Sequence, residues 1–194
     1  MFDVITVGGS PSGNSRSSAV LEYARRTIEH CGLRTWGISV RDLPPEDLIY
    51  GRLGSPALAE SMRLLRQARA VIIATPVYKA SYSGVLKTFL DLLPERILDG
   101  KLVLPIATGG SPAHLLAIDY ALRPVLTALG AQHTLRGVYI VDSQIQHDAT
   151  SLLLDLAVEE RLTAALQYLV DELIGAEAIE FASMQNKEAT YGKY

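Results

Sequence analysis

Short runs of β-branched and aliphatic residues alternate with longer stretches of helical periodicity, and this alternation restricts the fold more than any other feature. It predicts an open, mostly parallel sheet with helices on both faces. Strict alternation favours a five-stranded flavodoxin-like α/β fold, strand order 2-1-3-4-5, over a longer dinucleotide-binding sheet. The expected strands cover about residues 2–7, 34–40, 70–74, 101–107 and 137–141. The expected helices cover about residues 15–31, 55–68, 83–93, 113–129 and 151–174.

The composition is typical of one globular domain with a large core, since 48% of the 194 residues are hydrophobic and 20% are charged. We assign residues 1–174 to this domain. From Gly175 the periodicity weakens, so residues 175–194 are expected to form an extended or poorly ordered C-terminal tail. The single cysteine, Cys31, cannot form an internal disulfide and is expected to be a small buried hydrophobic residue.

The charge balance argues against a polyanionic partner. The formal net charge is -3 and no run of like charge stands out, so neither nucleic acid nor a membrane is an expected partner. No apolar stretch is long enough to span a bilayer, and the N-terminus lacks the positive region of a signal peptide, which favours a cytoplasmic location. The histidines lack metal-ligand spacing, so no metal site is expected.

The loop after the first strand, GGSPSGNSRSS at residues 8–18, is rich in glycine and serine. Serine hydroxyls beside the free N–H groups of a helix start can bind a phosphate, and an arginine adds positive charge. Because the loop matches neither the P-loop nor the G-x-G-x-x-G fingerprint, a single terminal phosphate such as that of FMN is favoured. A simple turn with an N-cap is the alternative. The candidate phosphate ligands are Ser10, Ser15, Arg16 and Ser17.

Two further loops follow later strands of the same sheet. With right-handed crossovers all three loops emerge on one edge, where a flat ring can lie across neighbouring strand ends. Backbone donors can bond the ring, glycine permits close approach, and Tyr78 can pack on the ring or wall its edge. Lys79 either pairs with an anionic cofactor or is a solvated loop charge. The candidate ring-binding residues are Pro76, Val77, Tyr78, Lys79, Ser81 and Ser83 in the second loop, and Thr108, Gly109, Gly110 and Ser111 in the third.

The fourth expected helix has a proline, Pro124, in its middle. Proline has no N–H to bond the carbonyl of Tyr120, so a kink or a local π-type widening is expected there. Such bulges are frequent at functional sites, which makes Asp119 and Tyr120 candidates for an active-site rim or a subunit interface. A simple proline kink buried in the core is the alternative.

Three segments together carry a family resemblance: GSPSGNSRSS from Gly9, PVYKASYSGVLKTFLDLLPER from Pro76, and ATGGSPAHLLAIDYALRPVLTALGAQ from Ala107. They resemble the NADPH-dependent FMN reductases of two-component alkanesulfonate monooxygenase systems, a branch of the wider NADPH-dependent FMN reductase superfamily. The similarity runs from about residue 4 to residue 146 and fades from His147 onward. It includes the stretch around Tyr120 as well as the short loops that the wider superfamily shares.

This resemblance implies a flavodoxin-like fold, FMN and NADPH as the cofactors, and delivery of reduced FMN to a flavin-dependent alkanesulfonate monooxygenase, a transient partner in sulfur scavenging. It also implies a homodimer or homotetramer, with a π-helix at the subunit interface whose inserted tyrosine matches Tyr120. The choice between NADPH and NADH stays open, because no clear arginine cluster for a 2′-phosphate is visible. No catalytic acid or base is assigned, since hydride transfer to a flavin depends mainly on positioning.

Other functions fit the sequence less well. The nearest rival uses the same fold and loops but keeps FMN bound and reduces quinones, azo dyes or metal oxyanions. A flavodoxin-like electron carrier is usually more acidic than this chain. A hydrolase lacks support because no G-x-S-x-G elbow is present. A pure interaction module would leave the three loops without an explanation.

Overall fold

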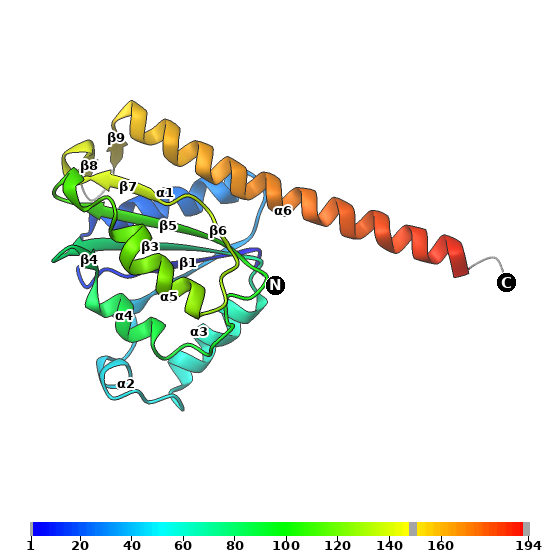
Figure 1. Ribbon diagram of the computed structural model, residues 1–194, viewed down its shortest axis with the longest axis horizontal. Helices are drawn as coiled ribbons and strands as arrows, with labels where there is room; N and C mark the ends of the chain where they lie inside the picture. Colours follow the sequence, from blue (N-terminus) through cyan, green and yellow to red (C-terminus); the bar gives the residue numbers. More distant parts are fainter. Residues whose placement is uncertain (1, 148–150, 192–194) are drawn as a thin grey trace.

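The computed structural model describes residues 2–147 and 151–191, and its centre is a parallel sheet with strand order β2-β1-β3-β5-β6 (Figure 1). The last position of the sheet is shared by two short segments, because both β6 and β7 pair in parallel with β5. The expected flavodoxin-like order is therefore confirmed. The strands of this sheet are β1 (Val4–Gly8), β2 (Thr35–Ser39), β3 (Ala70–Tyr78), β5 (Leu102–Gly109), β6 (His133–Thr134) and β7 (Val138–Val141).

Two smaller strand pairs accompany the main sheet. β4 (Ser81–Tyr82) folds back antiparallel on the end of β3, and β8 (Ile145–His147) pairs with β9 (Leu152–Leu154) in a separate two-stranded sheet. The helices are α1 (Arg16–His30), α2 (Pro45–Ile49), α3 (Pro56–Gln67), α4 (Gly84–Leu90), α5 (Arg123–Ala128) and α6 (Leu156–Tyr191), with short helical turns at η1 (Val40–Asp42), η2 (Pro112–His114) and η4 (Asp142–Gln144) and a π-helix at η3 (Ile118–Leu122).

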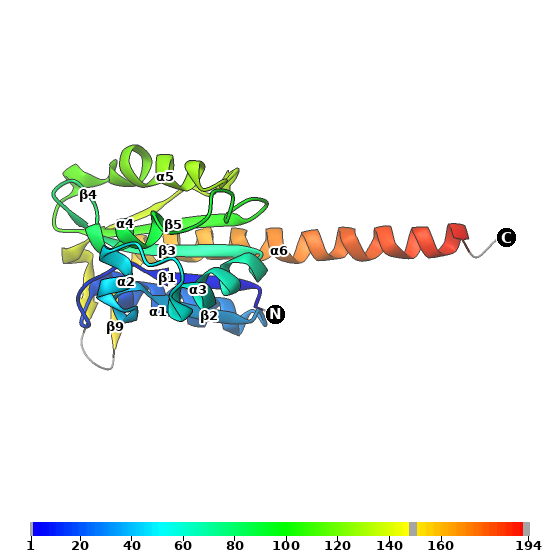
Figure 2. The same cartoon turned by 90° about the horizontal axis from the view of Figure 1, so that it is seen from below.

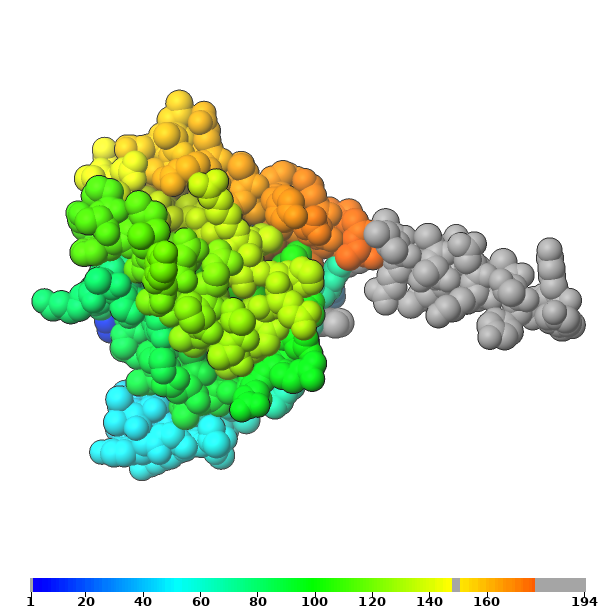
Figure 3. Space-filling model, viewed as in Figure 1, coloured from blue at the N-terminus to red at the C-terminus, as the bar shows by residue number. Residues whose placement is uncertain are grey.

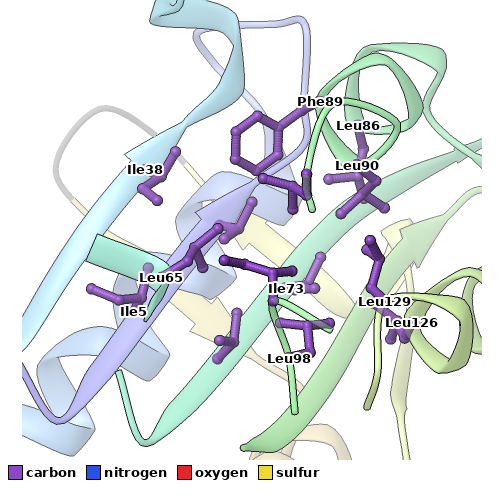
Figure 4. Close-up of a cluster of buried hydrophobic side chains, with 14 of the residues drawn as sticks. Ile5, Ile38, Leu65, Ile73, Leu86, Phe89, Leu90, Leu98, Leu126 and Leu129 are labelled. Carbon is purple, nitrogen blue, oxygen red and sulfur yellow. The ribbon is translucent and has the colours of Figure 1, made fainter. Parts of the chain in front are cut away.

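The helices cover both faces of the sheet, as Figures 1 and 2 show. Helices α1 and α6 pack on one face, and α3, α4 and α5 pack on the other, where Phe89 and Leu86 of α4 are fully buried (Figure 4). Successive residues of β3 enter opposite layers: Ile73 joins the α4 side and Ile72 the α1 side. A strand buried on both faces needs apolar residues at every position, which explains the unbroken run Val71-Ile72-Ile73-Ala74.

The C-terminal part of the chain differs from the sequence-based expectations. The helix expected from residue 151 begins only at Leu156, because residues 152–154 form strand β9. The sequence predicts an extended or poorly ordered tail for residues 175–194, whereas the structure describes α6 as helix as far as Tyr191 (Figure 1). This segment is rich in alanine and glutamate, which favour helix, and one glycine costs only about 1 kcal/mol within it. None of the helices in the described part of the chain is long and apolar enough to cross a bilayer.

Two more expectations need correction. The helix expected at residues 113–129 is divided into η2, the π-helix η3 and α5. Cys31 was expected to be buried, but its side chain is exposed, because it occupies the C-cap of α1 at the protein surface.

Ser83 joins three segments at the start of α4. Its hydroxyl accepts a hydrogen bond from the Leu86 N–H at 3.1 Å, as an N-cap does, and donates one to the Gly9 carbonyl in the first loop. Its own N–H donates to the Thr75 hydroxyl at 3.0 Å. Since Ser83 is 1% exposed, these bonds hold the loop after β1 against the end of β3 in a place without solvent.

Replacing Ser83 by alanine is expected to lower the free energy of unfolding by about 2 kcal/mol, because the variant loses a helix cap and leaves a buried carbonyl unpaired. Urea denaturation measures this change. The matched control is Ser61→Ala, since the Ser61 hydroxyl is also buried but bonds only the Ala57 carbonyl within its own helix. Equal losses in the two variants would show that Ser83 has no linking role.

Asp3 is buried beside the starts of β1 and β2. It accepts hydrogen bonds from the Arg34 N–H at 2.9 Å and from the Arg34 guanidinium at 3.1 Å. These bonds hold the pKa of the Asp3 carboxyl below its usual value, against the opposing effect of burial. A carboxyl with a depressed pKa in the folded state adds stability above its unfolded pKa, and this stability is lost as the pH falls through the folded value.

Asp3→Asn is therefore expected to lower the free energy of unfolding at pH 7 by about 1 kcal/mol. The loss is this small because the Arg34 side chain is exposed and solvent weakens its interaction with Asp3. The difference from the unchanged chain should shrink as the pH falls below about 4. Denaturation at a series of pH values measures it. Asp91→Asn, which removes an exposed partner of Lys87, serves as the control and should change stability little at any pH. A difference that does not vary with pH would contradict this account.

Candidate functional site

Three neighbouring strands, β1, β3 and β5, end at the same edge of the sheet, where β3 and β5 extend beyond the last residue of β1. Gly8 at the end of β1 pairs with Ala74 of β3, which pairs in turn with Ile106 of β5. The loops that follow these strands are those in which the sequence analysis placed the site. Because the strands are parallel and adjacent, the first loop lies beside the second and the second beside the third.

The serines of the first loop gather around the start of α1. Ser10, Ser15 and Ser17 are buried, and the hydroxyls of Ser15 and Ser17 lie 2.8 Å apart. Ser15 occupies the N-cap position, but its hydroxyl bonds Ser17 and makes no capping bond within the described chain. The first helical bond runs from the Ala19 N–H to the Ser15 carbonyl, so the N–H groups of the three preceding residues have no helical acceptor.

This arrangement fits an anion. Free N–H groups at a helix start carry partial positive charge, and the helix dipole favours a negative group there. The first turn of α1, fully within the described residues, holds no acidic side chain that would occupy this position. The buried hydroxyls of Ser15 and Ser17 bond each other, whereas the Ser10 hydroxyl bonds the backbone of Ser12. The donors present therefore suit the terminal phosphate of FMN.

Arg16 is not brought to this cluster. Its side chain is half exposed and lies 3.9 Å from the carboxylate of Asp142 in η4, on the side of the loop away from β2. A guanidinium and a carboxylate at this distance with such exposure interact weakly. The three serines and the helix start thus carry the candidate phosphate site, and a contribution from Arg16 requires its side chain to turn.

The second loop is more regular than the sequence suggested. Residues 76–78 belong to β3 rather than to a turn, and the chain reverses only at Lys79 and Ala80. Both residues have positive φ values, 50° and 66°, as a tight hairpin of this kind requires. Non-glycine residues rarely adopt this conformation, and such strain is often found at functional sites.

The second and third loops begin side by side. Pro76 pairs with Thr108 across β3 and β5, and both residues are buried. Further along, Val77 is partly buried, whereas Tyr78 is 49% exposed and Lys79 points into solvent. Of the ring-binding candidates in the second loop, Tyr78 therefore presents an exposed aromatic side chain at this edge.

The third loop leaves the sheet at Gly109 and turns at once. Gly109 is buried and Gly110 is exposed. The Ser111 hydroxyl accepts a hydrogen bond from the Ala113 N–H at 3.2 Å, which starts the short helical turn η2. The turn therefore presents backbone groups with little side-chain bulk, as close approach by a ring requires.

The irregularity expected near Pro124 is present as the π-helix η3, which spans Ile118–Leu122. Tyr120 lies within it with 78% of its surface exposed, and Asp119 bonds Arg123 one turn later at 3.1 Å. Leu115 and Leu116 are half exposed beside it. A buried proline kink is therefore excluded for Tyr120, because the segment turns this side chain outward.

Two cavities flank the three loops. A cleft of about 340 Å³ lies between the first loop and the end of β2, with Arg41 on its wall. A larger cavity of about 960 Å³ lies outside the third loop, between η3 and α6. In Figure 3 the green and yellow-green segments of its wall lie beside the orange start of α6. Neither cavity coincides with the expected ring position, since neither wall contains residues 76–83.

The sequence analysis missed three residues that shape the site. Gly9 packs against α4 so closely that an added Cβ would lie 2.7 Å from the Leu86 Cβ. Thr75 bonds the N–H of Ser83, and Tyr139 bonds the third loop from the neighbouring strand. The glycine pair after the first strand was a signal for Gly9. The contacts of Thr75 and Tyr139 depend on residues distant in sequence, so nothing in the local pattern marks them.

Comparison with known proteins identifies the family. The model of the family described as NADPH-dependent FMN reductase matches residues 2–146. The chain is 51% identical over 166 residues to an FMN reductase (NADPH) of Pseudomonas putida, covering 84% of each protein. It is 57% identical over 142 residues to an FMN reductase (NADPH) of Escherichia coli, covering 73% of this chain and 74% of that protein.

Comparison with solved structures supports the same family and fold. The apo form of an NADH:FMN oxidoreductase, EmoB, superposes with a TM-score of 0.77 at 39% identity, covering 88% of this chain and 89% of that one. A Streptococcus pneumoniae flavodoxin superposes with a TM-score of 0.62 at 17% identity, covering 87% and 98%, and shows the shared fold alone. The resemblance seen in the sequence is thus confirmed, and the chain belongs to the NADPH-dependent FMN reductase family.

Proposed function

We propose that this protein is an NADPH-dependent FMN reductase that binds free FMN and releases it in the reduced form. The observation that carries the proposal is the start of α1, where N–H groups without helical acceptors lie beside the buried hydroxyls of Ser15 and Ser17, in a loop whose Ser10 is also buried. Two relatives more than half identical to this chain bear the name FMN reductase (NADPH).

The three loops have separate roles in this proposal. Ser10, Ser15 and Ser17 bind the phosphate with the helix start, while the second and third loops bind the ring through backbone groups. Ser83 keeps the first and second loops together, since it bonds Gly9 and Thr75. When bound, the flavin supplies the hydride acceptor. The residues of the three loops would hold and orient it for hydride transfer from NADPH.

The coenzyme is inferred from the names of the relatives, and the partner is inferred from the sequence. Two relatives above 50% identity are named for NADPH, whereas a 39% identical structure is named for NADH, so we favour NADPH. We further propose that reduced FMN passes to a flavin-dependent alkanesulfonate monooxygenase in the cytoplasm. This partner is inferred from the resemblance of the sequence around Tyr120 to reductases of such systems.

The same resemblance supports a homodimer or homotetramer. The exposed apolar side chains Leu115, Leu116 and Tyr120 form one surface along η2 and η3. A surface of this kind on a soluble domain is typical of a contact between proteins. We propose that a second copy of this chain covers it.

Anaerobic mixing of the protein with NADPH and a large excess of free FMN is expected to reduce many equivalents of FMN per protein. Loss of oxidised flavin absorbance measures the reaction. Reduction of a single equivalent followed by arrest would instead indicate a tightly bound flavin that reduces another acceptor. NADH in place of NADPH, at equal concentration, tests the coenzyme and should give a lower kcat/KM.

Ser17→Asp is expected to weaken FMN binding by at least about tenfold, because a buried carboxylate would repel the phosphate at the helix start. Quenching of FMN fluorescence measures the affinity. The control is Ser143→Asp, which adds the same charge at an exposed position in η4 near the same edge. Ser17→Ala separates charge from the loss of the hydroxyl and should weaken binding less. Unchanged affinity in Ser17→Asp would exclude this phosphate site.

A further inference from the structure

Tyr139 lies beneath the third loop, on the strand next to it. It belongs to β7 and pairs with Ala107 of β5, two residues before the strand ends at Gly109. Its side chain is 8% exposed and packs with Ala107 and Ile118 in a small hydrophobic cluster. A tyrosine ring with so little freedom holds its hydroxyl at a defined position.

The hydroxyl of Tyr139 donates a hydrogen bond to the Ser111 carbonyl at 2.6 Å. The two residues are 28 positions apart, so this bond ties the third loop to a strand that follows α5. Burial, with a smaller effect of Asp142, raises the pKa of Tyr139. The hydroxyl therefore stays protonated at neutral pH and remains a donor.

Gly109 lies close to the same hydroxyl. A Cβ added at Gly109 would lie 2.4 Å from the Tyr139 hydroxyl oxygen and 3.4 Å from the Val77 Cβ. Contact with any atom at 2.4 Å is far below the van der Waals limit. The backbone of the turn therefore rests directly on the tyrosine, and both its start and its end are fixed by this one side chain.

We propose that Tyr139 is a positioning residue for FMN, which holds the turn from Thr108 to Ser111 where its backbone groups bind the ring. The inference rests on the proposed function. A binding site formed by backbone groups needs support from surrounding residues, since displacement of the turn moves every donor in it. Tyr139 supplies that support through its bond to Ser111 and its contact with Gly109.

Tyr139→Phe keeps the ring and removes the bond to Ser111. We expect FMN affinity to fall roughly 2- to 10-fold, the range for one hydrogen bond, with an equal rise in the KM for FMN. The KM for NADPH should remain close to that of the unchanged chain, and the melting temperature should fall by only a few degrees, as the loss of one partly buried hydrogen bond requires. Fluorescence titration and steady-state kinetics with each substrate varied give these values.

The control is Tyr168→Phe. Tyr168 lines the same cavity as Tyr139, but it is half exposed and its hydroxyl bonds Glu172 rather than a site loop. This variant should bind FMN as the unchanged chain does. Equal losses in the two variants would overturn the proposal, as would a Tyr139→Phe variant with unaltered FMN affinity.

A double-mutant cycle with Gly109→Ala tests the contact itself. Gly109→Ala alone should weaken FMN binding strongly, because the added methyl group collides with the hydroxyl. Combined with Tyr139→Phe, the same change should cost less, because the colliding oxygen is absent. Strictly additive effects would overturn the proposal, since they would show that the two residues act independently.

The unchanged chain tests the proposed function, and the Tyr139→Phe variant tests the positioning role. If the unchanged chain neither binds nor reduces FMN, both are overturned. If it reduces many equivalents and Tyr139→Phe behaves like it, only the positioning role is overturned. A larger fall in melting temperature with equal changes in both KM values would indicate general loss of stability and would likewise overturn the positioning role.

Discussion

Parallel pairing of β1, β3 and β5 is the constraint on which the rest of the structure depends. It brings three strand ends to the same edge of the sheet, although their loops are separated by tens of residues in the chain. Because the strands are adjacent, each loop begins close to the loop of the neighbouring strand. Ser83 completes this contact between the first two loops, and Tyr139 holds the third from below.

The candidate site uses few charged groups. Its positive potential comes from the start of α1, where N–H groups lack helical partners, and from serine hydroxyls that burial removes from water. Arg16, the one cation expected there, lies near Asp142 instead. Such a site depends on the precise placement of neutral dipoles, which explains why Gly9 and Gly109 are packed so closely against their neighbours.

Much of this could be predicted from the sequence, because it depends on local patterns. Apolar runs located the strands, the glycine-serine loop marked the helix start, and Pro124 predicted the irregular helix that contains Tyr120.

Other features could not be predicted. The continuation of β3 to Tyr78 and the hairpin at Lys79 depend on pairing between strands, whereas the apolar run in the sequence indicates a strand only as far as residue 74. The end of α6, from Gly175, has a weak apolar periodicity, so the helix propensity of its residues was underestimated.

By itself the sequence determined the order of the main strands and helices, the three loops at one edge and the family, since each of these rests on residue types at short spacing. Only the tertiary structure decided how the loops are held. The bonds from Ser83 to Gly9 and from Tyr139 to Ser111 join residues 74 and 28 positions apart. Such contacts exist only once the sheet has formed, because the distance between their partners is set by strand pairing and not by the chain between them.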